Sequence, residues 1–308
     1  MRTLTLLPLL LSLGCPVADD SADPDDTGPG DTDTTVDTAD TGPVDTGETP
    51  TCVPNGDGRI DWSEFVADPA LGINAVYTTN TPGSVVTVPP VGGVDQGDAS
   101  YAWDFSAVDA GSDTQWTISL TEPGDAWFAD HFPTATYTVA LDASEAVLGV
   151  YRVNDATERL ELLGLASADQ DTGDVLVYEE PVVVFDFPIS VGNSWSSEAV
   201  QADGHWEDED YPADFGWHGV VTLHHSYAFE VDRAGTLEAP LGSFEVLRLR
   251  ADQRMEAVNS LYGTFAEETQ LSYFYVAECT GLVARVRSTG DERDPDFDQA
   301  GEYLRLGF

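Results

Sequence analysis

The sequence of 308 residues contains no lysine, and its 12 basic residues, all arginines, face 56 aspartates and glutamates. The formal net charge is therefore -44. Because a chain this acidic repels phosphate backbones and anionic membrane surfaces, it argues against nucleic acid as a partner. The lack of lysine also excludes Schiff-base chemistry, a Ser–Lys dyad and the lysine of a phosphate-binding P-loop.

The apolar run near the amino terminus, Leu4–Leu13, is too short to span a bilayer and follows the positive start Met1-Arg2. It ends in Leu13-Gly14-Cys15, and a small residue directly before such a cysteine resembles a bacterial lipobox. This resemblance implies a signal peptide over residues 1–14 and a lipid anchor at Cys15, which would attach the protein to the membrane. Since Pro16 rather than aspartate follows, we expect an outer membrane lipoprotein, either at the cell surface or facing the periplasm. The alternative is ordinary signal cleavage nearby, with Cys15 removed or left free.

The segment from Cys15 to Pro50 consists almost wholly of Asp, Thr, Gly, Pro and Ala, with no basic or aromatic residue. Such a composition cannot bury enough apolar surface to offset the entropy of ordering, so we expect residues 15–50 to form a disordered acidic linker. A flexible chain of this length has an average end-to-end distance of about 35 Å.

Residues 51–68 contain the pattern of a short calcium loop. With Gly58 at the sixth position, the oxygen ligands fall at Asn55, Asp57, the Arg59 carbonyl, Asp61 and Glu64. The pattern resembles the EF-hand-like loops of dockerins, but its first position is Val53 instead of aspartate. Two interpretations stay open: a weak calcium site, of millimolar affinity, or a turn without metal.

From about residue 75 the sequence alternates between apolar and polar residues and is interrupted by turn residues. We expect residues 69–308 to form one all-β domain, an antiparallel meander that closes into a sandwich or curls into a half-barrel. The segments with the clearest strand pattern are 116–120, 135–141, 147–153, 159–165, 175–178, 182–187, 220–231, 244–250, 269–278, 282–286 and 303–306.

The order of these features resembles a group of uncharacterised β-rich lipoproteins of Gram-negative bacteria. The likeness rests on the lipobox, the Asp/Thr tether, the cysteine-led loop and a body with motifs such as Val191-Gly192-Asn193-Ser194-Trp195 and Glu278-Cys279-Thr280-Gly281-Leu282. The resemblance covers nearly the whole chain and implies architecture and location, without a known activity.

The other candidate sites have simpler explanations. His224 and His225 point to opposite faces of a strand, so a zinc site among the histidines is not favoured. The pairs Arg248/Arg250 and Arg285/Arg287 each share a strand face, and cross-strand ion pairs, for example with Glu267 or Glu268, are favoured over an anion pocket. The remaining candidates are the acidic run 207–210, His131, His205 and His218, and a binding surface built from Trp103, Trp116, Trp127, Trp195, Trp206 and Trp217.

If Cys15 carries lipid, only Cys52 and Cys279 remain. Because an exported protein enters an oxidising compartment, we predict a disulfide between them; two unrelated cysteines are the alternative.

These observations favour a non-enzymatic, membrane-anchored lipoprotein that displays a β-rich interaction or structural domain. A periplasmic carrier that holds an apolar ligand in a half-barrel groove is the alternative, and an enzyme acting on glycans or peptides is less favoured. The sequence does not identify whether a protein, a glycan or an apolar molecule is the partner.

Overall fold

The computed structural model describes residues 52–65, 74–171, 174–205, 221–259 and 263–307. Its strands are β1 (Arg59–Ile60), β2 (Asn74–Asn80), β3 (Val86–Thr87), β4 (Val94–Gly97), β5 (Ser100–Asp104), β6 (Asp113–Ser119), β7 (Tyr137–Ala140), β8 (Val147–Asn154), β9 (Arg159–Ser167), β10 (Val175–Asp186), β11 (Ile189–Ser190), β12 (Ser194–His205), β13 (Val221–Ala239), β14 (Gly242–Asn259), β15 (Gly263–Ala277), β16 (Gly281–Ser288) and β17 (Gln299–Leu306). Two 3-10 helices, η1 (Trp62–Glu64) and η3 (Ala129–His131), complete the elements. The predicted signal peptide, lipid anchor and linker lie outside the described residues.

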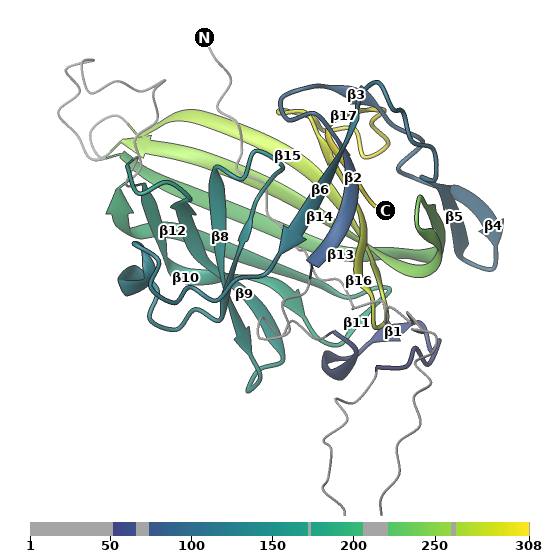
Figure 1. Cartoon of the computed structure of the whole chain (residues 1–308), viewed down its shortest axis with the longest axis horizontal. Helices are drawn as coiled ribbons and strands as arrows, with labels where there is room; N and C mark the ends of the chain where they lie inside the picture. Colours follow the sequence, from purple (N-terminus) through teal and green to yellow (C-terminus); the bar gives the residue numbers. More distant parts are fainter. Residues whose placement is uncertain (1–51, 66–73, 172–173, 206–220, 260–262, 308) are drawn as a thin grey trace, which may run out of the picture.

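The main sheet is antiparallel along the order β6-β2-β17-β16-β15-β14-β13-β12-β10-β9-β8-β7, and it curls until its two ends meet (Figure 1). Thr121, just after β6, and Thr138 in β7 close the sheet by donating their N–H groups to each other's carbonyls at 3.0 and 2.7 Å. The molecule is therefore an almost closed barrel, and the predicted all-β antiparallel fold is confirmed.

The alternation of side chains defines the inner face of the barrel. In β13, Tyr227 and Phe229 are buried, whereas Ala228 and Glu230, which alternate with them, are exposed. Because successive side chains point to opposite faces of a strand, this pattern assigns the first pair to the interior and the second to the outside.

A second layer covers the outer face of β14–β17, so that β16 is buried on both faces. Trp103 and Phe105 pack against Tyr275, and Phe297 packs against Tyr273. This layer is anchored by the Val91 carbonyl, which accepts hydrogen bonds from Trp103 Nε1 at 3.0 Å and from the Tyr275 hydroxyl at 3.1 Å.

The topology departs from the predicted meander at two places: β2 and β3 pair with the last strand, β17, and β5 pairs with β13 in the parallel direction. The close approach depends on Gly235, where a Cβ would lie 1.8 Å from the Tyr101 carbonyl oxygen. The sequence pattern also underestimates strand length. Segment 175–178 and all but the last residue of segment 182–187 belong to the single strand β10, whose pairing with β9 shifts between Val177 and Val182.

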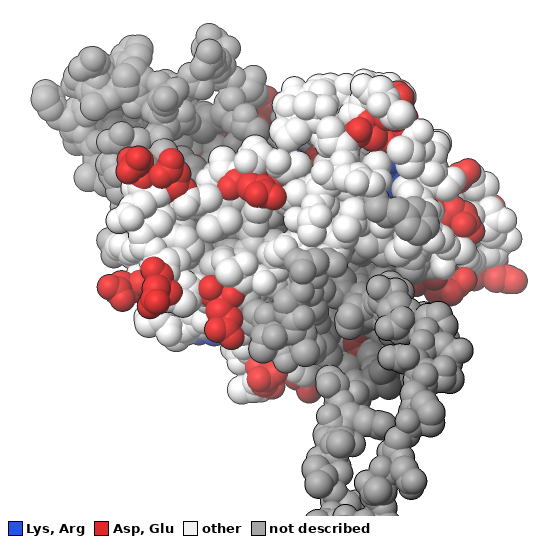
Figure 2. Space-filling view, viewed as in Figure 1, with Lys and Arg blue, Asp and Glu red and all other residues white. Residues whose placement is uncertain are grey.

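Most of the described arginines are buried or half buried, and this burial adds to the acidity of the surface. Four of them, Arg248, Arg285, Arg287 and Arg305, are buried. In the view of Figure 2, carboxylates form separate clusters on the surface while very little arginine is visible. These four buried arginines bind carboxylates and carbonyls of the protein itself.

Candidate functional site

The cysteine-led loop is attached to the barrel by a disulfide between Cys52 and Cys279, which confirms the predicted pairing. Their Cα atoms are 5.5 Å apart, within the range of native disulfides. The loop is also attached without the bond: β1 pairs with β11, and Ile60 and Phe65 are almost fully buried. The ring of Phe65 packs edge-on against Phe185 with the centroids 4.7 Å apart.

Glu278, the residue before the disulfide cysteine, holds the start of this loop. Its Oε2 accepts the N–H groups of Asn55 and Gly56 at 2.6 and 3.0 Å. The Cys279 N–H in turn donates to the Glu64 carbonyl at 3.0 Å. The end of β15 thus binds both ends of the predicted calcium loop, a role for Glu278 that its sequence position does not reveal.

The predicted calcium ligands lie together in one loop but already have partners. Asn55 Oδ1 accepts the Asp57 N–H at 2.8 Å, and Asp57 Oδ1 accepts the Arg59 N–H at 2.9 Å. Glu64 accepts the Asp61 N–H and the Asn55 amide at 2.9 and 2.7 Å. These bonds preserve the sharp turn that a calcium loop requires.

One of these ligands has a competing partner, since Asp61 forms an ion pair with Arg59 at 2.6 Å. Both side chains are largely exposed, so the pair contributes little to stability, but a metal ion would have to displace it. Among the residues that the structure describes, no group of three or more His, Cys, Asp or Glu side chains is placed to hold a metal ion. Calcium binding thus stays a prediction.

The two arginine pairs lie on opposite faces of the sheet and therefore do not form one pocket. Arg248 faces outward, where it pairs with both oxygens of Asp232 and donates to the Val91 carbonyl. Arg250 pairs with Asp252 at 2.9 Å. The predicted pairing of these arginines with carboxylates is present. Glu267, however, pairs with Arg254, because Arg254 lies opposite Thr269, two residues from Glu267 on the same strand face.

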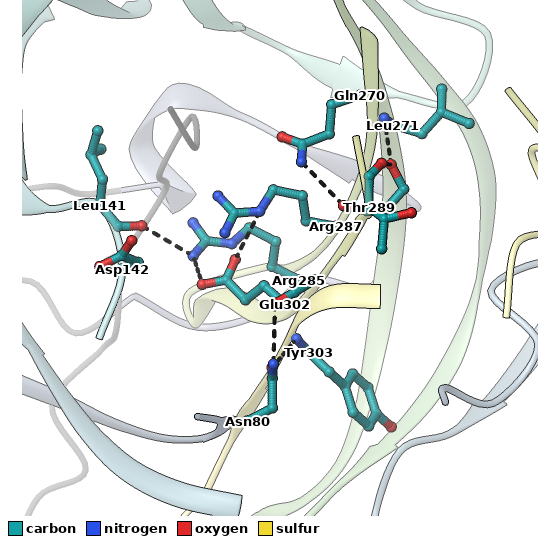
Figure 3. A network of polar contacts seen from close by, with 12 residues as sticks. Asn80, Leu141, Asp142, Gln270, Leu271, Arg285, Arg287, Thr289, Glu302 and Tyr303 are labelled. Carbon is teal, nitrogen blue, oxygen red and sulfur yellow. Dashed lines mark hydrogen bonds and ion pairs between the residues drawn. The ribbon is translucent and has the colours of Figure 1, made fainter. Parts of the chain in front are cut away.

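Arg285 and Arg287 face the interior of the barrel, where they meet Glu302 from β17 (Figure 3). Arg285 Nη2 lies 2.6 Å from Glu302 Oε1, and Arg287 Nε lies 3.9 Å from Glu302 Oε2. Burial lowers the pKa of Arg287, Glu302 opposes this effect, and the charge of Arg285 adds to it. The alternation in β17 identifies Glu302 as an inward residue, but only the register shows which arginines it meets.

This internal cluster contains buried hydrogen-bonding atoms without a partner. They are Nε and Nη1 of Arg285, Nη1 of Arg287, Oε2 of Glu302 and Oε1 of Gln270. A buried polar group that lacks a partner costs about 1–3 kcal/mol. The cluster is therefore the least satisfied polar region of those described inside the barrel.

Another part of the interior contains His225, which packs against Tyr178 and Tyr227. Burial lowers the pKa of His225 to about 4, and the charge of His224 adds to this shift. His225 faces inward, and its half-buried neighbour His224 points to the opposite face of the strand, so the two side chains do not point to a common place. His218 and the acidic run 207–210 lie outside the described residues.

The tryptophans do not form a common binding surface in the described part of the chain. Trp103 and Trp116 are buried, and Trp195 stacks on Phe229. Each donates its indole N–H within the protein, for example Trp195 to the Val183 carbonyl at 2.9 Å. Trp127 donates similarly to the Ser167 carbonyl, whereas Trp206 and Trp217 lie outside the described residues. The four described members of the predicted surface therefore act in packing.

A groove of about 510 Å³ crosses the outer face of β12–β15. Its outward lining includes Ser196, Ser226, Arg250, Arg254, Thr269 and Arg293. Carboxylates offset this charge, because Arg250 pairs with Asp252 and Arg254 with Glu256. A continuous cluster of buried apolar and aromatic side chains lies inside the barrel and extends beneath the second layer.

These features define a class: an all-β protein with an almost closed antiparallel barrel and an amino-terminal loop attached by a disulfide. No protein-family model and no curated protein sequence matches the chain. A crystal structure of a Bacteroides fragilis protein with a YmcC-like fold is 10% identical, with a TM-score of 0.25 over 83% of this chain and 97% of that chain. This likeness is too low to carry an argument. Among the described residues, no helix has the length and apolar character needed to cross a membrane.

Proposed function

We propose that this protein is an exported, non-enzymatic lipoprotein, anchored to the outer membrane through Cys15, that displays its barrel as an interaction or structural domain. The observation that carries the proposal is the Cys52–Cys279 disulfide, because such bonds persist in oxidising compartments outside the cytoplasm. The lipobox-like Leu13-Gly14-Cys15 supports the anchor, and the acidic linker would separate the barrel from the membrane.

Within this proposal the cysteine-led loop has a structural role, attached to the barrel, and contains a weak calcium site. Support comes from the preserved turn bonds of Asn55 and Asp57, and from Glu278, which holds the loop on the barrel. The absence of a carboxylate at Val53 and the pairing of Asp61 with Arg59 both favour low affinity. The alternative of a carrier for an apolar ligand gains no observation in its favour, because the apolar and aromatic side chains described inside the barrel pack against one another.

The experiment replaces Cys15 by serine in the full chain and follows the protein through membrane fractionation and mass spectrometry. We expect the wild type to carry lipid and to sediment with membranes, and Cys15→Ser to lose both properties. The Cys52→Ala/Cys279→Ala variant is the matched control, because it changes cysteines without touching the anchor and should stay membrane-bound. An unmodified Cys15 in the wild type would refute the anchor.

Protease treatment of intact cells then decides between the two membrane faces. A barrel displayed at the surface is cleaved from whole cells, whereas one facing the periplasm is cleaved only after the outer membrane is permeabilised.

A further inference from the structure

The side chains of Arg285 and Arg287 lie next to each other on β16 and point into the barrel (Figure 3). Glu302 from β17 lies beside them, and the Leu141 carbonyl, from the turn between β7 and β8, accepts a long hydrogen bond of 3.5 Å from Arg285. Arg285 is fully buried and Arg287 is 9% exposed. Two cations are thus held in the interior of a molecule whose surface is strongly acidic.

The carboxylates near this pair do not satisfy it. A guanidinium has five N–H donors, but Arg285 uses only Nη2, and its Nε and Nη1 have no partner. Arg287 Nη1 also has none, and its Nε lies 3.9 Å from Glu302, beyond hydrogen-bond length. Asp142 acts on Arg287 through its negative charge, which raises the pKa of Arg287, and its Oδ1 accepts the N–H and the hydroxyl of Ser144.

We propose that the Arg285–Arg287 pair is a binding site for a small oxyanion, a carboxylate or phosphate group. Planar guanidinium groups match the paired oxygens of such anions, and charge-assisted bonds of this kind are stronger than neutral ones. The single carboxylate of Glu302 cannot neutralise two guanidinium groups or accept all of their N–H bonds. An oxyanion supplies both the missing negative charge and the missing acceptors. A water molecule would supply acceptors alone.

The two arginines have different roles in this site. Arg287 is the entry side, since 11% of its side chain is exposed, whereas that of Arg285 is completely enclosed. Glu302 orients Arg285 through their 2.6 Å bond and at the same time competes with the incoming anion for positive charge. This site is independent of the membrane anchor and of the cysteine-led loop.

The test measures the thermal unfolding midpoint of the full chain in increasing sodium formate and in sodium phosphate, against sodium chloride at matched ionic strength. We expect a saturable increase with at least one oxyanion that chloride does not reproduce. The anion with the stronger effect identifies whether a carboxylate or a phosphate group is preferred.

Variants then locate the effect. Arg287→Gln should weaken the apparent affinity by about tenfold or more, because it removes a charged hydrogen-bonding group. Glu302→Gln should increase the dependence on the anion, because it removes the competing carboxylate. Arg254→Gln, which changes an exposed arginine on the outer face, is the control and should retain the wild-type response.

Equal midpoints in chloride and in both oxyanions would overturn the proposal, as would an oxyanion effect that survives in Arg287→Gln. If Arg287→Gln does not fold, a crystal structure of the wild type grown in formate and phosphate decides the question. Density for an oxyanion between the two guanidinium groups supports the site, and water alone in that place overturns it.

Discussion

Replacing Cys52 and Cys279 together by alanine should cost the protein up to about 5 kcal/mol of unfolding free energy. The bond joins residues separated by 227 positions, and the chain-entropy relation for a closed loop of this length predicts that magnitude. Alanine is the appropriate replacement because Cys279 is buried, with 7% of its surface exposed, and a serine hydroxyl there would need a partner.

The loop should nevertheless stay attached to the barrel in this variant. Ile60 and Phe65 are 1% and 3% exposed, and these contacts do not require the disulfide. A matched variant, Phe65→Ala with the bond intact, should lose about 3–5 kcal/mol through the cavity it creates. The two variants therefore separate the covalent attachment of the loop from its packing.

The measurement is urea-induced unfolding followed by tryptophan fluorescence, with linear extrapolation to zero denaturant. Peptide mapping without reducing agent first establishes that the wild-type bond is formed. A change below about 1 kcal/mol in the double variant would refute the entropic argument. Proteolytic cleavage of residues 52–65 in the double variant would show instead that the bond is needed to keep the loop in place.

Three other predictions concern the interior and the loop. Arg285→Met should lower the unfolding free energy by about 3 kcal/mol, because it removes the 2.6 Å partner of the buried Glu302 and leaves that carboxylate only the 3.9 Å contact with Arg287. Arg254→Met on the surface should cost less than about 1 kcal/mol, and urea unfolding compares the two. His225 has its pKa lowered to about 4 in the folded protein, so the unfolded chain binds more protons between pH 6.5 and 4. Its contribution, on the order of 3 kcal/mol, is complete above pH 6.5 and is lost as the pH falls towards 4; His225→Gln should flatten the stability profile in this window, and an unchanged profile would contradict the assignment. Calorimetry at low ionic strength should find at most one weak calcium site in the loop, strengthened by Val53→Asp and removed by Glu64→Ala; no heat in either the wild type or Val53→Asp would establish a turn without metal.

Local features of the sequence were sufficient to predict the fold class and much of the strand pattern. The alternation of apolar residues has the two-residue period of a strand, as in 147–153, which lies within β8. The Cys52–Cys279 bond was also predictable, because assigning Cys15 to the anchor leaves a single pair. Strand length was harder to predict: β12 begins Ser194-Trp195-Ser196-Ser197, and small polar residues give little contrast between its two faces.

The tertiary structure decided which distant residues meet. The register of β16 against β17 places Glu302 beside Arg287, and Gly235 allows β5 to join β13 in parallel. The end of β15 places Glu278 on the amides of the cysteine-led loop. None of these contacts follows from local pattern, because a shift of one residue in strand register exchanges the inner and outer faces. The sequence by itself thus determined the class of fold and the covalent link. The register of the strands in the folded sheet determined which charged side chains meet inside the barrel.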